Sequence, residues 1–189
     1  MANPLGVVAF AGSLRKESIN RLLLRSVISM APENLAISEL DIQDIPLFNQ
    51  DVEDKDPPGS VVRFKESIES ADGLLIVTPE YNWGIPAVTK NLIDWASRRN
   101  TTPGNVLLNK PVSIMSIAGG VTSVGALARR QLRDVIVYPR AIPMPSSDVG
   151  LSGGLSNFDE NGNLVNEAAR EAVAQNLTAF ADWIKRLAS

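Results

Sequence analysis

Apolar residues fall in short runs that alternate with longer segments of helical spacing. The apolar runs predict strands over residues 6–11, 36–40, 73–78, 112–118 and around 135–142. Segments with apolar positions three or four residues apart predict helices over 20–31, 60–71, 86–98, 123–133 and 167–187. The first, third and fourth strands are nearly continuous runs rich in Val and Ile, which is typical of strands covered on both faces. The alternation favours a parallel sheet between two layers of helices.

Five strands in this order predict an α/β protein with a flavodoxin-like five-stranded parallel sheet and helices on both faces. We expect a single domain over residues 1–189, because this length supports one substantial core. In such sheets, ligands bind beyond the carboxyl ends of the strands. The irregular, acidic and proline-containing segment 41–59 is expected to be a surface loop, or a loop that shapes a substrate pocket.

Charge and hydropathy narrow the setting of the protein. The net charge of −3 lacks the basic footprint of a nucleic-acid-binding protein, so nucleic acid is not expected as a partner. No apolar stretch approaches the ~20 residues of a membrane span, and the N-terminus lacks the pattern of a secretory signal. These features predict a cytoplasmic protein.

The sequence contains no His and no Cys. Imidazole acid–base catalysis, thiol nucleophiles, Cys-ligated iron–sulfur clusters and the usual zinc sites are therefore excluded. A Walker A loop, a G-x-G-x-x-G fingerprint and a G-x-S-x-G elbow are also absent. If the protein is an enzyme, a cofactor is expected to carry the reaction, with no metal and no catalytic side chain. The acidic segment 157–163 departs from a calcium-loop pattern and is expected to be a surface turn.

A cluster of polar residues lies between the first strand and the first helix. The segment reads Gly12-Ser13-Leu14-Arg15-Lys16-Glu17-Ser18-Ile19-Asn20. A turn that enters a helix presents unpaired N–H groups and the positive end of the helix dipole, which together favour a phosphate. Ser13, Ser18 and Asn20 add short donors, and Arg15 adds a planar guanidinium. The alternative is an ordinary capped helix with a solvent-facing arginine.

A second polar segment, Pro79-Glu80-Tyr81-Asn82-Trp83, follows the third strand. Its position at the same sheet edge predicts a platform for a planar ring. Simple packing or an oligomer contact is the alternative for Tyr81 and Trp83, because aromatic residues are common in both settings. A third segment, 116–120, ends in two glycines that would permit close backbone approach.

These motifs, together with Pro86, Lys90-Asn91 and Ile93-Asp94-Trp95, resemble the NADPH-dependent FMN reductase family, which includes quinone, chromate and azo-dye reductases. The resemblance covers nearly the whole chain. It implies FMN as cofactor, NAD(P)H as co-substrate, and a homodimer or homotetramer with sites near the subunit interfaces. The FMN-binding residues that it implies are Ser13, Arg15, Ser18, Ile19, Asn20, Pro79, Glu80, Tyr81, Asn82, Ser116 and Gly119.

Residues 124–127 depart from the family pattern, which often has a second glycine pair followed by arginine. We therefore transfer no detailed ring or nicotinamide contact to this loop. Arg129 and Arg130 are expected to be solvated or to face a partner subunit.

The function expected from these features is transfer of electrons from NAD(P)H through FMN to a small acceptor in a ping-pong cycle. The acceptor would be a quinone, a flavin, chromate or an azo compound. Two alternatives remain open: a flavodoxin-type electron carrier that does not oxidise NAD(P)H, and a non-catalytic binding module.

Overall fold

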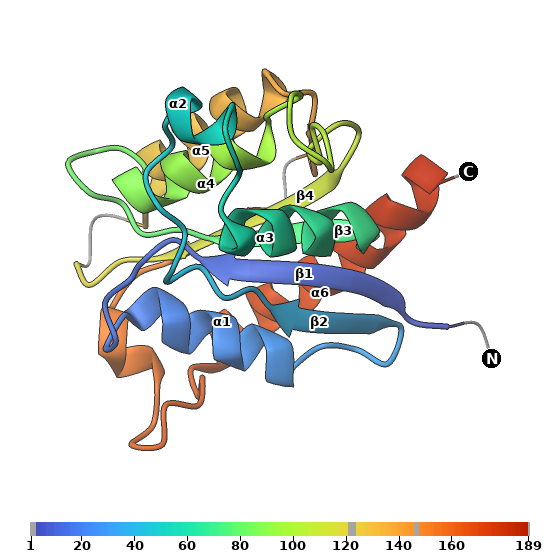
Figure 1. Cartoon of the computed structure of the whole chain (residues 1–189). Helices are drawn as coiled ribbons and strands as arrows, with labels where there is room; N and C mark the ends of the chain where they lie inside the picture. Colours follow the sequence, from blue (N-terminus) through green and yellow to red (C-terminus); the bar gives the residue numbers. More distant parts are fainter. Residues whose placement is uncertain (1–2, 121–123, 146–147, 189) are drawn as a thin grey trace.

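The computed structural model describes residues 3–120, 124–145 and 148–188. Its strands form a parallel sheet in the order β2-β1-β3-β4-β5, and β6 also pairs with β4 (Figure 1). The strands are β1 (Leu5–Ala11), β2 (Leu35–Glu39), β3 (Gly73–Val77), β4 (Pro111–Ile117), β5 (Ile142–Pro143) and β6 (Val149–Leu151). The helices are α1 (Ile19–Ser29), α2 (Gln50–Glu53), α3 (Gly59–Ser70), α4 (Ala87–Ala96), α5 (Ala126–Val137), the short 3-10 helix η1 (Gly154–Asn157) and α6 (Glu167–Ala188).

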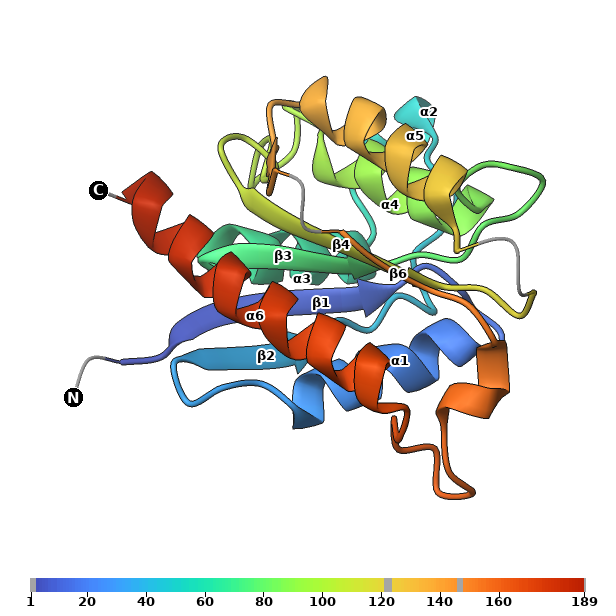
Figure 2. The same ribbon diagram turned by 180° about the vertical axis from the view of Figure 1, so that it is seen from behind.

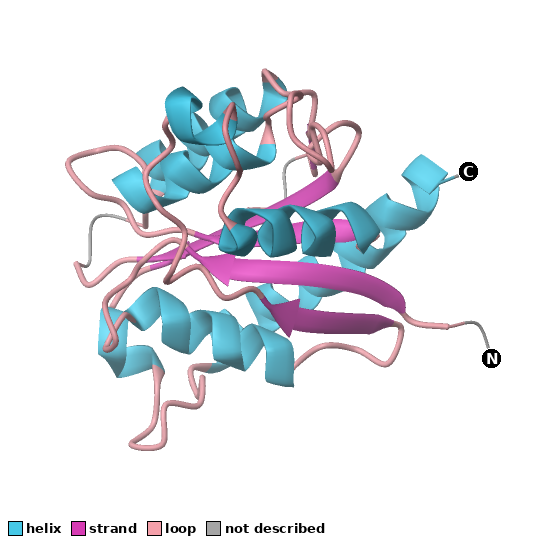
Figure 3. Ribbon diagram, viewed as in Figure 1, coloured by secondary structure: helices cyan, strands magenta, loops and turns pink. Residues whose placement is uncertain are grey.

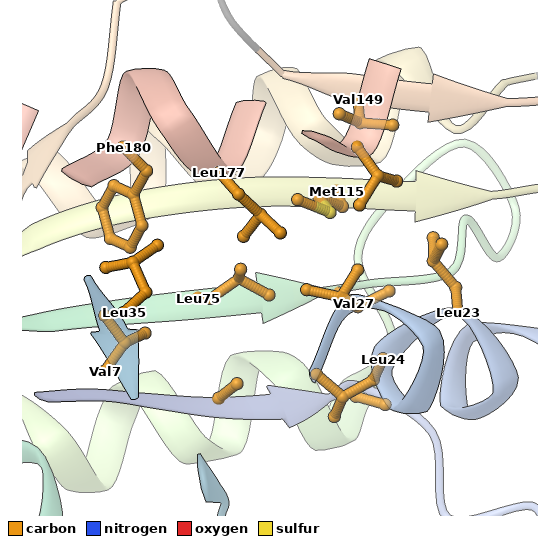
Figure 4. Packing of buried hydrophobic residues seen from close by; sticks show 14 of the residues in the cluster. Val7, Leu23, Leu24, Val27, Leu35, Leu75, Met115, Val149, Leu177 and Phe180 are labelled. Carbon is orange, nitrogen blue, oxygen red and sulfur yellow. The ribbon is translucent and has the colours of Figure 1, made fainter. Parts of the chain in front are cut away.

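Helices cover both faces of the sheet and create two hydrophobic layers. Buried residues of α1 and α6 pack against one face, as Figure 2 shows from behind and Figure 4 shows for the side chains. Residues of α3, α4 and α5 pack against the other face. The central strands β3 and β4 are buried along their whole length, because their alternate side chains enter the two layers. The flavodoxin-like fold predicted from the alternating pattern is therefore confirmed.

The last position of the sheet is occupied by two short strands on the same side of β4. β5 pairs with the start of β4, and β6 pairs with its end through Met115, Ser116 and Ile117. The prediction of a strand around 135–142 was wrong for the first of these residues, which form the end of α5. Ala128, Leu132 and Ile136 are buried four residues apart on one helix face, and this packing outweighs the β-branched character of the segment.

Two further differences concern the loops. The segment 41–59 contains α2, whose N-cap Asn49 accepts a hydrogen bond from the N–H of Asp51 at 2.9 Å. The helix predicted over 123–133 corresponds to α5, which begins at Ala126 after its N-cap Gly125. Ser123 lies outside the described part of the chain. No helix in the described ranges is both long and apolar enough to cross a membrane.

Loops that follow β1, β3 and β4 meet at the end of the sheet toward which the strand arrows point (Figure 3). The parallel register sets this meeting point, since Ala11 pairs with Val77 and Val77 pairs with Met115. The three polar segments singled out in the sequence occupy these loops.

Candidate functional site

A cavity of about 380 Å³ lies between the three loops at the carboxyl end of the sheet. Its volume falls within the range of about 300–1,000 Å³ that is typical of small-molecule sites. Most of the residues predicted to bind FMN meet here, although they come from three separate parts of the chain. The lining consists of Arg15, Ser18, Ile19, Asn20, Pro79, Glu80, Tyr81, Ile117, Ala118, Gly119 and Gly120.

The N-terminus of α1 forms one end of this cavity. Ser18 is the N-cap, but its side chain makes no capping hydrogen bond, and the first turn of the helix contains no acidic residue. Among the described residues, no hydrogen bond uses the N–H groups of Ile19 and Asn20. The guanidinium of Arg15 is exposed and donates only to the carbonyl of Glu17. This end of the cavity therefore presents uncompensated positive potential to an anion.

The side chain of Asn20 forms hydrogen bonds with the backbone at the end of β4. Its Nδ2 donates to the carbonyl of Ile117 at 3.0 Å, and its Oδ1 accepts from the N–H of Ile117 at 3.1 Å. The amide thus ties the start of α1 to the end of β4 instead of pointing into the cavity with both polar atoms. Sequence reasoning had treated Asn20 as a phosphate donor and did not find this tie.

A tight turn forms the opposite end of the cavity. Tyr81 and Gly84 exchange two backbone hydrogen bonds of 3.0 Å, and the two residues between them, Asn82 and Trp83, have φ values of 49° and 66°. Two positive φ values are characteristic of a type I′ turn. Tyr81 is 52% exposed and Trp83 is 80% exposed. Tyr81 lines the cavity, and the turn exposes a second aromatic side chain, that of Trp83, two residues further along the chain.

Glu80 fixes this turn to the neighbouring helix. Its Oε2 accepts hydrogen bonds from the N–H groups of Leu127 at 2.9 Å and Ala128 at 3.0 Å, in the first turn of α5. The carboxylate thereby compensates the positive end of the α5 dipole. Glu80 lines the cavity and also sets the position of the loop that follows β3.

Glycines around the cavity have two different roles. A Cβ at Gly12 would lie 2.0 Å from Oγ1 of Thr89, so packing within the protein requires glycine there. Within the described part of the chain, a Cβ at Gly119 or Gly120 would meet nothing within 4 Å. Packing among the described residues does not require these two glycines, which line the cavity and leave space for close approach of a ligand.

Three of the predicted residues do not line the cavity. Ser13 is buried, and its Oγ accepts a hydrogen bond from the N–H of Arg15 at 3.4 Å. The exposed Asn82 lies at the tip of the turn. Ser116 is fully buried and donates to the carbonyl of Val124 at 2.6 Å. A direct contact of these three side chains with FMN stays a prediction, and the structure shows local structural roles for Ser13 and Ser116.

The two adjacent arginines of α5 lie in different environments. Arg130 is exposed, as expected for a solvated residue. Arg129 is not solvated, because only 13% of its side chain is exposed, and burial lowers its pKa from the usual value. Of the two alternatives expected for Arg129, solvation is therefore contradicted, and contact with a partner subunit stays a prediction. The inner face of α5 buries it against the end of β4.

The described residues do not place three or more His, Cys, Asp or Glu side chains where they could hold a metal ion. The predicted surface turn at 157–163 has an internal explanation for its acidic residue. Asp159 accepts hydrogen bonds from the N–H groups of Asn161 and Asn163 at 2.9 and 2.8 Å. The side-chain amide of Asn163, which donates to Oδ2 of Asp159 at 2.9 Å, is the main reason that the pKa of Asp159 is lowered, and the two N–H groups add to this shift.

The cavity matches the chemistry of FMN. A helix N-terminus with free N–H groups and an exposed arginine suits the phosphate, and the glycine turn at 117–120 together with Tyr81 suits a planar ring. The cavity thus combines donors for an anion with small and aromatic residues for a ring.

Comparisons with known proteins agree with this interpretation. Residues 5–156 match the family described as NADPH-dependent FMN reductase. The chain is 37% identical over 187 residues to an NAD(P)H-dependent FMN reductase of Pseudomonas aeruginosa, with 99% of each chain covered. It is 36% identical over 191 residues to a quinone reductase of Escherichia coli K12, again with 99% of each covered. The structure of the flavoenzyme NAD(P)H:(acceptor) oxidoreductase FerB from Paracoccus denitrificans matches with a TM-score of 0.87 and 31% identity, covering 96% of this chain and 98% of FerB.

Proposed function

Because the chain belongs to the NADPH-dependent FMN reductase family, we propose that it is an NAD(P)H-dependent reductase whose acceptor is a quinone. The family is one of oxidoreductases that use FMN with NAD(P)H as co-substrate. The quinone is the part of the proposal that goes beyond family membership. It is supported by the full-length similarity to the Escherichia coli quinone reductase and by the half-exposed aromatic side chain of Tyr81, which lines the cavity.

The observation that carries the proposal is the pairing of an anion site with a glycine turn in one cavity. Arg15, Ser18 and the N–H groups of Ile19 and Asn20 would hold the phosphate of FMN. The turn at 117–120 and the segment 79–81 would hold the ring and the ribityl chain. When bound, FMN supplies the capacity to accept a hydride from NAD(P)H and to pass electrons to the acceptor.

The protein contributes position and electrostatics to this chemistry. Glu80 and Asn20 connect the loops that follow β1, β3 and β4 to each other or to α5, so the walls of the cavity are held by hydrogen bonds. Preorganised walls reduce the cost of ordering a ligand. No side chain is assigned a proton-transfer step.

The surface around the cavity supports assembly of two or more copies of the chain. Tyr81, Trp83 and Leu127 are 52%, 80% and 46% exposed, and Glu80 joins their two segments by accepting a hydrogen bond from the N–H of Leu127. Large apolar side chains gathered near a site are typical of an interface. We propose a homodimer or homotetramer with this surface in contact. Because NAD(P)H is an intracellular co-substrate, we also propose that the protein acts in the cytoplasm.

The absorbance spectrum of the purified protein, followed by anaerobic addition of NADPH or NADH, tests this function. A flavin spectrum that bleaches with either nucleotide and recovers with a quinone supports the proposal. A flavin spectrum that neither nucleotide bleaches would indicate a flavodoxin-type carrier. If FMN added to the protein does not bind, the protein is a binding module of another kind.

Steady-state kinetics test whether one open site serves both substrates. If NAD(P)H and the quinone use the site in turn, initial-rate plots give the parallel lines of a ping-pong cycle. Intersecting lines would instead show that both substrates bind together. Chromate and an azo dye, assayed under the same conditions, show whether either is a better acceptor than the quinone.

A further inference from the structure

Arg129 connects both ends of the segment that contains the glycine turn. Its Nη1 donates to Oγ of Ser116 at 2.5 Å and also to the carbonyl of Val124. Ser116 itself donates to the same carbonyl at 2.6 Å. The guanidinium, the hydroxyl and the carbonyl therefore form a closed triangle of hydrogen bonds at the base of the loop that leaves β4.

Asp148 and the β6 residue Gly150 lie next to the guanidinium of Arg129. Its Nε lies 3.9 Å from Oδ2 of Asp148, and Asp148 is fixed by Arg133 through hydrogen bonds of 2.9 and 2.6 Å. Gly150 of β6 lies directly over the guanidinium, because a Cβ there would be 2.3 Å from Nη1 of Arg129. The absence of a side chain at position 150 thus makes room for the arginine.

The residues that this triangle holds are adjacent to those that line the cavity. Ser116 precedes Ile117, and the lining continues through Ala118, Gly119 and Gly120. On the other side of the loop, Val124 leads into Gly125, where φ is +68° and a Cβ would be 2.5 Å from Oγ of Ser116. Both ends of the loop are therefore packed around one hydroxyl, and Arg129 supplies the charged donor that orients it.

We propose that Arg129 is a positioning residue for the flavin: through Ser116 and Val124 it holds the cavity-lining residues 117–120 in the conformation that accepts FMN. The inference rests on the proposed FMN site and assigns to Arg129 a role through other residues, without contact with the cofactor. Arg130, one position further on, has the same charge but is exposed, and it makes no such contacts with the residues that the structure describes. It is therefore a matched control.

Two substitutions disrupt this triangle of hydrogen bonds in different ways. Arg129→Met deletes the guanidinium and keeps most of the side-chain volume. Gly150→Ala keeps the guanidinium but places a methyl group where it lies, and the flexible end of the arginine has to move. The backbone at Gly150 does not have a positive φ, so alanine introduces no backbone strain there. Both variants are compared with Arg130→Met.

Titration of each apoprotein with FMN measures the effect. We expect Arg129→Met and Gly150→Ala to bind FMN about ten-fold more weakly than the wild type, which is the size of effect found for groups coupled in one hydrogen-bond network. Arg130→Met should bind as the wild type does. In the double variant that combines Arg129→Met with Gly150→Ala, the alanine should cause no further loss of FMN affinity. The guanidinium that it would displace is already absent from that protein. Arg129→Lys should fall between the wild type and Arg129→Met, since a single ammonium group cannot reproduce the paired contacts of the guanidinium.

Amide hydrogen exchange of the apoproteins gives a readout that needs no flavin. Faster exchange at residues 117–120 in Arg129→Met and Gly150→Ala, but not in Arg130→Met, supports the inference that Arg129 holds these residues in place. The inference is overturned if both variants bind FMN as tightly as the wild type, even if their melting temperatures fall, because the role would then be structural only. If the wild type itself fails to bind FMN, the proposed function fails instead, and the exchange measurement still decides whether Arg129 holds the loop.

Discussion

Asn20 satisfies both backbone groups of Ile117, a residue 97 positions away in the sequence. The two hydrogen bonds, of 3.0 and 3.1 Å, join the first turn of α1 to the last residue of β4. The phosphate end and the glycine turn of the cavity are thereby held at a fixed separation. Asn20 is 1% exposed, so no water can replace its amide without a rearrangement.

Replacement of Asn20 by Ala should reduce both stability and FMN affinity. It leaves a buried N–H and a buried carbonyl unsatisfied, at a cost of about 1–3 kcal/mol for each group. The melting temperature of the apoprotein should fall by roughly 5 °C or more. Asn100→Ala, at an exposed position, is the control and should melt as the wild type does. Calorimetry of the two apoproteins decides the matter; equal melting temperatures would show that the tie is unimportant.

Replacement of Arg15 by Ala should have the opposite profile. The side chain is exposed, and within the described ranges its one hydrogen bond goes to the carbonyl of Glu17, so the apoprotein should keep its melting temperature. Loss of a charge-assisted pair worth ~1.5–3 kcal/mol should weaken FMN binding roughly 10- to 100-fold. Titration with FMN measures this, and Lys16→Ala provides the neighbouring exposed cation as control. An unchanged dissociation constant would remove Arg15 from the phosphate site.

Gly119→Ala tests whether the open space beside the glycine turn belongs to the ligand. The added methyl group would contact none of the described residues within 4 Å, and φ at Gly119 is not positive. The melting temperature of the apoprotein should therefore stay the same or rise slightly. FMN affinity should fall about ten-fold, because a methyl group in a closely approached site forces the ligand or the loop to move. Full FMN affinity in Gly119→Ala would place the ring elsewhere.

The central sheet could be predicted from the sequence because its signal is local. The strands β1, β3 and β4 are continuous apolar runs, and such runs are buried whatever their neighbours are. The end of α5 was mistaken for a strand because Val135, Ile136 and Val137 have strong strand propensity, and only the distant packing of Ile136 makes them helical.

The candidate site could be predicted only in part, for a related reason. Turn residues and helix starts are visible in the sequence, so the three loops of the cavity were found. The tasks of Asn20, Glu80 and Arg129 were not found, because each side chain bonds to groups that are 97, 47 or 48, and 13 or 5 residues away, respectively. The sequence alone does not distinguish a polar side chain that binds a ligand from one that forms hydrogen bonds with the backbone.

The burial of Lys65 leads us to expect that the free energy of unfolding rises with pH. Its side chain is 1% exposed and donates to the carbonyl of Arg98 at 3.0 Å and to Oγ1 of Thr101. Burial lowers the pKa of Lys65 to about 8, although Glu53 nearby opposes the shift. Between pH 8 and the usual lysine value near 10.5, the unfolded chain therefore binds more protons than the folded chain, and the free energy of unfolding increases with pH.

Denaturant unfolding of the wild type and of Lys65→Met between pH 7.5 and about 10 measures this contribution. The stability difference, wild type minus variant, should increase across this range by between about 1 and 3 kcal/mol. Lys110, whose pKa burial also lowers, is present in both proteins and cancels. Lys55→Met changes an exposed lysine and should leave the pH dependence unaltered. A flat difference for Lys65→Met would show that Lys65 titrates normally.

Trp83 combines a strained backbone with an exposed aromatic ring. Its φ of 66° is rare for a bulky residue, and its side chain is 80% exposed. Packing within the described chain gives no reason to keep tryptophan there, and strain that persists at a cavity rim points to a function. We expect Trp83 to contact the quinone or a second subunit beside the site.

Trp83→Gly separates the strain from the contact. Glycine adopts positive φ without penalty, so the apoprotein should be more stable by roughly 0.5–1 kcal/mol and melt about 1–4 °C higher. FMN affinity should be unchanged, because Trp83 does not line the cavity. Quinone reduction should lose at least about five-fold in kcat/KM, the effect of a contact worth ~1 kcal/mol. Trp83→Asn, which also tolerates positive φ, should lose activity to the same extent because it too lacks the ring. A variant that is more stable and fully active would show that the tryptophan is dispensable, and the exposed ring would then have no part in acceptor binding or assembly.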